Sequence, residues 1–127
     1  MRTIAFIFVI TIAFVGCNKA DNSPVNSRDF IGKWKMVSQS GGLAGHTERI
    51  PEDSLFTLTL NRDKTYQYMR NSKLKATGRY VLKTIGDESL ITFDGATLSQ
   101  NIGTRNDSLF VSDRFPDGFG TLYIKVK

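Results

Sequence analysis

The stretch Asp29-Phe30-Ile31-Gly32-Lys33-Trp34-Lys35-Met36-Val37-Ser38 decides the fold. Side chains two residues apart share one face of a β-strand, so Phe30, Gly32, Trp34 and Met36 lie together. Lys33 and Lys35 lie on the opposite face. The stretch therefore predicts a half-buried strand that packs the only tryptophan of the chain into a core and leaves its lysines in water.

Seven further stretches alternate apolar and polar residues in the same way and predict short strands. They span residues 54–61, 65–70, 74–83, 89–94, 96–102, 108–113 and 119–127. Polar turn residues separate most of them, as in hairpins with short loops. The side chains expected to face inward are Phe56, Leu58, Leu60, Tyr66, Tyr68, Leu74, Ala76, Gly78, Tyr80, Leu82, Ile91, Phe93, Leu98, Ile102, Leu109, Val111, Leu122, Ile124 and Val126. Gly78 is expected to mark a bend or a close backbone approach.

These eight strands predict an all-β domain, because no stretch shows a helical period over ten or more residues. Short loops favour an antiparallel meander, and closing the meander into an up-and-down barrel removes its exposed edges. Eight strands leave an interior wide enough for side chains or one small ligand. A flattened two-sheet sandwich is the alternative architecture.

The N-terminal part of the chain predicts export. An apolar run covers residues 4–15, with Arg2 before it and Gly16-Cys17 after it, as in a signal peptide. The run is shorter than the roughly 20 apolar residues that a membrane-spanning helix needs. We therefore expect a cleaved signal peptide over residues 1–16, a polar tether over 17–28 and one barrel domain over 29–127.

Cys17 is the only cysteine, so the domain has no internal disulfide. Phe14-Val15-Gly16-Cys17 resembles the lipobox of bacterial lipoproteins, although Phe14 replaces the usual leucine. The resemblance implies that Cys17 becomes the first residue and carries several acyl chains of the palmitate type. It also implies attachment to a membrane of the bacterial cell envelope, with the outer membrane expected. Plain secretion and an uncleaved anchor are the alternatives.

The charge of the exported part is mildly positive. Without Arg2 the chain has 16 basic and 12 acidic residues, a net charge of +4. A surplus of this size is typical of a solubilising surface, and a preference for anionic lipids, glycans or acidic ligand heads stays open. A nucleic-acid partner is not expected, because the aromatic residues fall at core positions and the chain is exported.

A family resemblance follows from these motifs. Phe30-Ile31-Gly32-Lys33-Trp34 looks like the G-x-W signature in the first strand of lipocalins and fatty-acid-binding proteins. Residues 58–66, followed by Gly78-Arg79-Tyr80, look like the small lipocalin-like (calycin-type) lipoproteins of Bacteroidetes-type bacteria. The resemblance implies that Trp34, with Gly32, closes one barrel end and that the other end is an open mouth. The chain lacks the C-terminal helix and helical lid of these families, so a shallow or filled cavity is expected.

Two groups of residues are candidates for ligand binding. The longest predicted loop, 39–53, holds Leu43, His46 and Arg49, and such loops are often functional. In the resemblance this loop folds over the mouth as a lid, whereas a solvated loop is the alternative. The second group shares the inward face of its strands and predicts an aromatic pocket with a cation for an anionic ligand head. It comprises Tyr66, Tyr68, Arg70 and Tyr80, for which simple core packing is the alternative.

Catalysis and metal binding are not expected. The domain has one histidine, no cysteine beyond the anchor, no G-x-S-x-G elbow and no phosphate-binding loop. The leading hypothesis is a monomeric, membrane-anchored barrel, without a cofactor, that binds a small hydrophobic or amphipathic molecule. The alternative is a protein-interaction or inhibitor module, or a structural lipoprotein with a filled barrel.

Overall fold

The computed structural model describes residues 27–127, which form one short 3-10 turn, η1 (Ser27–Asp29), and nine β-strands. The strands are β1 (Gly32–Gly41), β2 (His46–Arg49), β3 (Phe56–Leu60), β4 (Thr65–Arg70), β5 (Lys73–Ile85), β6 (Glu88–Phe93), β7 (Gln100–Arg105), β8 (Ser108–Ser112) and β9 (Gly120–Lys125). No α-helix occurs within these residues. The predicted signal peptide and Cys17 lie outside the described residues.

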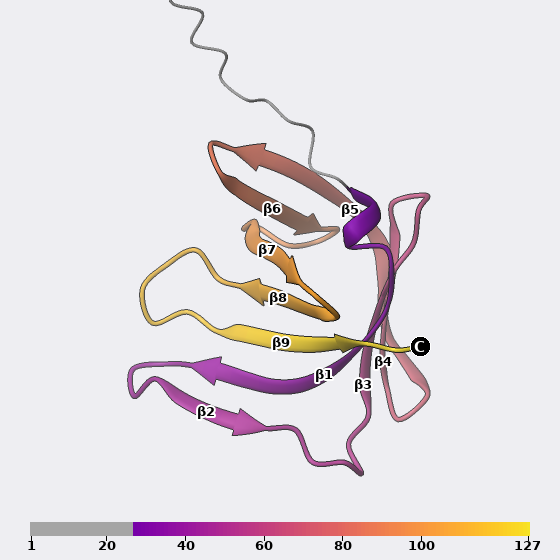
Figure 1. Cartoon of the computed structure of the whole chain (residues 1–127), viewed down its shortest axis with the longest axis vertical. Coiled ribbons are helices and arrows are strands. Elements are labelled where there is room, and N and C mark those ends of the chain that lie inside the picture. Colours follow the sequence, from indigo (N-terminus) through magenta and orange to yellow (C-terminus); the bar gives the residue numbers. More distant parts are fainter. Residues whose placement is uncertain (1–26) are drawn as a thin grey trace, which may run out of the picture.

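Eight of the strands form a closed antiparallel barrel (Figure 1). Their order is β1, β3, β4, β5, β6, β7, β8 and β9, and β9 returns to pair with β1 between Trp34↔Lys125 and Ser40↔Gly120. Each strand therefore pairs with the next along the chain, with β2 as the one insertion. The predicted eight-stranded up-and-down barrel is confirmed, and closure satisfies the sheet edges that an open meander would expose.

The predicted loop 39–53 is largely a β-hairpin, so its assignment as a long loop is wrong. The last four residues of β1 pair with β2, from Ser38↔Arg49 to Gly41↔His46. Gly42 and Gly45 have positive φ and close the turn, in which the Gly45 amide donates to the Gly42 carbonyl at 3.0 Å. β2 has no local signal in the sequence, because its four residues are polar and exposed and so show no apolar alternation.

The β1–β2 hairpin is attached to the loop between β8 and β9, and Figure 1 shows the two side by side. The Gly42 amide donates to the Asp117 carbonyl at 3.2 Å. A Cβ atom at Gly41 would lie 2.5 Å from the Gly118 carbonyl oxygen, so only glycine permits this approach. The hairpin is thus a continuation of the barrel wall held by backbone contacts.

The connections alternate between two ends of the barrel, as they must in an up-and-down topology. The closed end carries η1, the β3–β4, β5–β6 and β7–β8 turns, and the end of β9. The mouth carries the β1–β2 hairpin and the β4–β5, β6–β7 and β8–β9 loops. The described chain therefore enters the barrel from the end opposite the mouth.

Trp34 packs the closed end. It is 1% exposed, and its indole Nε1 donates to the Phe30 carbonyl at 2.9 Å. The Lys125 ammonium lies 5.3 Å from the centre of the indole ring, where a cation–π attraction is favourable. Gly32 has a φ of +143°, and a Cβ there would meet the Lys125 side chain at 3.3 Å. The predicted structural roles of Gly32 and Trp34 agree with this packing.

The buried core and the eight strands of the closed barrel are both formed by residues from Phe30 onward. The core cluster runs from Phe30 to Tyr123 and includes the fully buried Leu60, Ile91 and Leu109. Every strand of the closed circuit also lies after residue 31. We therefore expect the barrel domain to fold independently of the preceding segment.

The predicted inward face of the last strand is wrong. Tyr123 is 6% exposed in the core, whereas Ile124 is 41% exposed and Val126 is also exposed. Tyr123 is paired with Leu109 on β8 and with Met36 on β1, both of which face the core. Because β9 closes the barrel, its two neighbours decide which of its faces turns inward.

Two other strands differ from the prediction, one in where it begins and one in which side chains face inward. The stretch 96–102 was expected to be a strand, but β7 begins at Gln100 and Leu98 is 66% exposed in the preceding connection. On β5, Leu74 and Ala76 are exposed instead of inward. The β4–β5 register shifts between Tyr68 and Met69, as at a β-bulge, and this ends the simple alternation near the mouth.

Candidate functional site

A cavity of about 430 Å³ opens at the mouth of the barrel, and we term it the mouth cup. Its walls come from seven connected parts of the barrel: β3, β4, β6, the β6–β7 connection, β7, β8 and β9. The lining residues are Leu58, Tyr66, Tyr68, Phe93, Asp94, Gly95, Ala96, Gln100, Val111, Thr121 and Tyr123. The cup is therefore largely apolar and aromatic, with a few polar groups.

Two aromatic rings form one corner of the cup. The Tyr66 and Phe93 rings meet edge to face, with centroids 4.7 Å apart and planes at 66°. Gly78 on β5 makes room for this corner, since a Cβ there would lie 3.2 Å from both Tyr66 Cε1 and Asp94 Cβ. The predicted close approach at Gly78 is thus confirmed, and it brings Tyr66 and Asp94 together.

Tyr68 and Tyr123 supply the other aromatic groups of the cup. Burial is the main cause that raises the pKa of Tyr123; the neighbouring Tyr68 raises it further, and a hydrogen bond with the Thr121 side chain opposes the rise. Burial also raises the pKa of Tyr68, against the effect of the Arg70 charge. Both phenols are therefore neutral near pH 7.

The charge of the cup is carried by one carboxylate. Asp94 is the only charged residue among those that line it. Its Oδ2 accepts a hydrogen bond from the Arg79 amide at 3.0 Å, which fixes the carboxylate at the lip. Beside it, Gln100 Nε2 donates to Asp113 Oδ1 at 2.9 Å. The lining contains hydroxyl, amide and carboxylate groups, and no lysine, arginine or histidine.

The structure divides the predicted aromatic pocket. Tyr66 and Tyr68 line the cup, as expected for pocket residues. Tyr80 is instead buried in the core, where its hydroxyl donates to the Asn61 carbonyl at 2.7 Å and the Lys64 ammonium lies 5.6 Å from its ring. The guanidinium of Arg70 lies 5.1 Å from the centre of the Phe56 ring and is not part of the lining.

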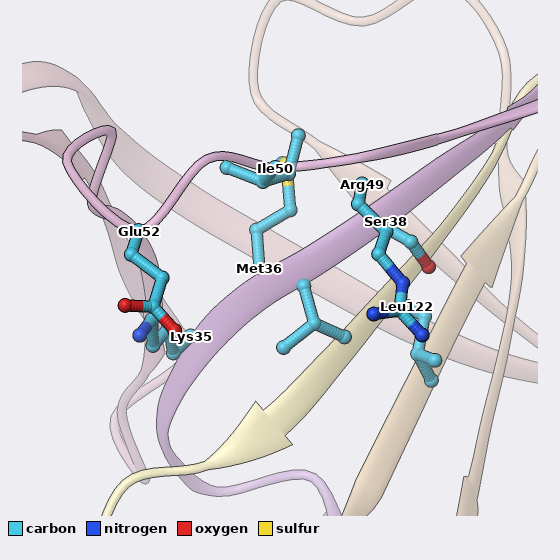
Figure 2. Close-up of a pocket in the computed structure, with 8 residues that line it drawn as sticks. Lys35, Met36, Ser38, Arg49, Ile50, Glu52 and Leu122 are labelled. Atoms are coloured by element: carbon cyan, nitrogen blue, oxygen red, sulfur yellow. The ribbon is translucent and has the colours of Figure 1, made fainter.

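The predicted lid residues do not line the cup either. Leu43 is 94% exposed at the tip of the β1–β2 hairpin, and His46 is exposed at the start of β2. Arg49 contributes to a separate hollow of about 420 Å³, lined by residues of β1, by Ile50 and Glu52 of the β2–β3 connection and by Leu122 of β9, which we term the outer hollow. Figure 2 shows this outer hollow, with Ile50 close to Met36, and with the Arg49 guanidinium directed toward Leu122.

Several cup residues were not recognised as site residues in the sequence. Phe93 was expected to face inward but only as a core residue, and Tyr123 was expected to face outward. Asp94 and Gly95 resemble a two-residue hairpin turn, whereas the connection runs to Ser99 and β6 pairs with β7 at only two positions. The two-residue alternation of β6 correctly indicates that Phe93 faces inward. No local pattern indicates that Asp94 and Tyr123 line the cup.

Other site types find no support within residues 27–127. No group of three or more histidine, cysteine or acidic side chains in this range is placed to hold a metal ion. In the same range, no helix has the length and apolar character to span a membrane. Neither the protein-family models nor the curated proteins contain a match for this chain.

The raised pKa of Tyr123 predicts a loss of stability at alkaline pH. A tyrosine whose pKa is higher in the folded than in the unfolded state stabilises the fold fully below the unfolded value of about 10. Above pH 10, the unfolded chain ionises first and the free energy of unfolding falls, by up to about 1.4 kcal/mol per pH unit for one group. Urea denaturation between pH 9 and 11.5 is expected to show a shallower fall for Tyr123→Phe than for the unchanged protein. Equal slopes would contradict the burial of this phenol.

Proposed function

We propose that this protein is a lipid-anchored, lipocalin-like barrel that binds a small amphipathic molecule in the mouth cup. The main support for this proposal is the cavity of about 430 Å³ within a closed barrel, which is lined by aromatic and aliphatic side chains with a few polar groups. Small-molecule sites are typically concave and mostly apolar, with a small number of placed polar groups. The G-x-W motif at Gly32 and Trp34 supports the lipocalin-like assignment.

The anchor is part of the proposal and rests on the lipobox-like residues that end at Cys17. Several acyl chains give stable membrane attachment, whereas one chain binds only marginally. The position of η1 is compatible with such an anchor, because η1 lies at the closed end and leaves the mouth free. We propose a monomer in the bacterial cell envelope, with a binding rather than a catalytic role.

The binding proposal is tested on the barrel domain from residue 18 onward, purified under native conditions. Mass spectrometry of the intact protein is expected to reveal a co-purifying small molecule. If the cup is empty, titration with a fluorescent hydrophobic probe is expected to reach one molecule per barrel. Ala96→Trp at the exposed lip should fill the cup and abolish this binding. Glu52→Trp, which fills the outer hollow, is the matched control and should leave it unchanged. A domain that stays empty and takes up no probe would refute the proposal.

A second candidate function, a protein-interaction or inhibitor module, is favoured by the apolar residues around the mouth. Leu98 on the β6–β7 connection and Phe115 and Phe119 on the β8–β9 loop are more than half exposed, as is Leu43 on the hairpin. Exposed apolar groups on adjacent loops are typical of protein docking surfaces. Cross-linking in envelope membranes would favour this candidate if one partner were lost on Leu98→Ser and Phe119→Ser while the cup bound no probe.

A further inference from the structure

We infer that the mouth cup is an aromatic cage for an organic cation, a substituted ammonium group carried on an apolar body. This inference rests on the proposed binding function and specifies its ligand class. It depends on the combination of four aromatic rings, one carboxylate and no basic side chain in the lining.

The aromatic rings provide the first attraction. The face of an aromatic ring is negative, and a cation within about 6 Å of its centre is stabilised, more strongly where water is excluded. Tyr66 and Phe93 form a corner with centroids 4.7 Å apart, so a small cation can contact both rings. Tyr68 is held in place by the Phe56 ring, at a centroid distance of 6.1 Å, and Tyr123 is fixed in the core. The rings are therefore pre-arranged, which lowers the entropy lost on binding.

The carboxylate provides the second attraction. Asp94 stands beside Tyr66 at Gly78, and its Oδ2 is oriented by the Arg79 amide. The chain has an excess of positive charge, +5 over its full length and +4 without Arg2 of the predicted signal peptide, yet the only charged group that lines the cup is negative. Asp94 is exposed at the lip, where a negative group on a positive protein attracts cations, so charge adds to apolar area as a source of selectivity.

The same arrangement disfavours an anionic ligand head, which the sequence had suggested for Arg70. The Arg70 guanidinium lies over the Phe56 ring, and Arg49 faces the outer hollow, so neither cation lines the cup. An anion in the cup would lose its water without gaining a basic partner in the lining, although the Arg70 charge reaches the Tyr68 phenol, and it would lie near Asp94. Fatty-acid-like ligands are therefore expected to bind more weakly than alkylammonium ligands of equal length.

The test compares three ligands of one chain length by calorimetry on the barrel domain, below their micelle concentrations. They are decyltrimethylammonium, the water-soluble neutral isostere decyldimethylphosphine oxide, whose head has a similar size but no charge, and decanoate. We expect the cation to bind at least about threefold more tightly than the neutral isostere, the range that a cation–π contact supplies, and decanoate to bind most weakly.

Two substitutions localise the preference. Asp94→Asn keeps a side-chain oxygen for the Arg79 amide and is expected to remove most of the preference for the cation. Phe93→Leu keeps an apolar wall but removes an aromatic face, so cation affinity should fall more than that of the neutral isostere. Glu52→Gln, a carboxylate of the outer hollow, is the matched control and should change neither affinity. Circular dichroism spectra identify any variant that does not fold.

The outcomes separate the two proposals. Equal affinity for the cation and its neutral isostere, or a preference for decanoate, would overturn the cage and leave the binding of small amphipathic molecules intact. Binding of none of the three ligands would overturn the proposed function itself. A cation preference that persists in Asp94→Asn and Phe93→Leu would place the site elsewhere and also overturn the cage.

Discussion

Replacing Trp34 with alanine is expected to lower the free energy of unfolding by about 3–5 kcal/mol, the range for removal of a buried aromatic side chain. The indole is 1% exposed at the closed end, and its removal leaves a cavity beside Phe30 together with an unpaired Phe30 carbonyl. Since typical domains have only about 5–15 kcal/mol of stability, this loss is large enough to unfold a fraction of the protein. Urea denaturation followed by far-UV circular dichroism measures it without needing tryptophan fluorescence.

Two control substitutions separate the loss of packing from the loss of the hydrogen bond and from the effect of removing any apolar side chain. Trp34→Phe keeps most of the packing but loses the hydrogen bond from Nε1 to the Phe30 carbonyl, so an intermediate loss is expected. Leu43→Ala removes an equally apolar but 94% exposed side chain and should change stability by less than about 0.5 kcal/mol. A loss below about 1 kcal/mol for Trp34→Ala would show that the closed end is not packed around the indole.

Replacing Cys17 with serine in the full-length chain is expected to move the protein from the membrane fraction to the soluble fraction. The serine hydroxyl cannot form the thioether through which a lipoprotein cysteine carries its lipid. Without several acyl chains nothing in the proposed architecture holds the barrel to the bilayer. Fractionation after an alkaline wash measures this shift, and incorporation of a labelled fatty acid into the unchanged protein but not the variant identifies the lipid.

The barrel itself serves as the control for the anchor experiment. Cys17 precedes the strand circuit and the core, so the variant should retain the circular dichroism spectrum and the urea midpoint of the barrel domain. If the variant stayed in the washed membranes, the lipid anchor would be wrong and the apolar run at residues 4–15 would have to act as an uncleaved anchor. If the unchanged protein were soluble, plain secretion would replace the proposal.

The anchor and the cup lie at opposite ends of the proposed architecture. The described chain begins at η1, at the closed end, and the cup opens at the other end. Nine residues, 18–26, separate Cys17 from η1, and the fully extended chain from Cys17 to Ser27 spans about 35 Å. With the anchor proposed at Cys17, we expect the mouth to open away from the membrane that holds the protein, toward ligands in the aqueous compartment.

The candidate site was only partly predictable from the sequence. Tyr66 and Tyr68 alternate on one strand, and this local pattern predicted that both face inward, where they also line the cup. Tyr80 has the same parity but a different height in the barrel, so it lies in the core near the closed end. Periodicity predicts the face of a side chain, whereas its depth along the barrel depends on the stagger between strands.

The sequence by itself determined the all-β class, the antiparallel meander and the buried position of Trp34, because these follow from two-residue alternation and short loops within single segments. Closure was predicted with a two-sheet sandwich as the alternative, and the long-range pairing of β9 with β1 decided between them. Only the tertiary structure decided that β2 continues β1, that Tyr123 faces inward and that Asp94 joins Tyr66 at the cup. The physical reason is that the local alternation in β9 favours the face that turns outward, and that β2 has no apolar face at all. Hydrogen bonds to neighbours far along the chain then choose the register, and the register fixes which side chains meet.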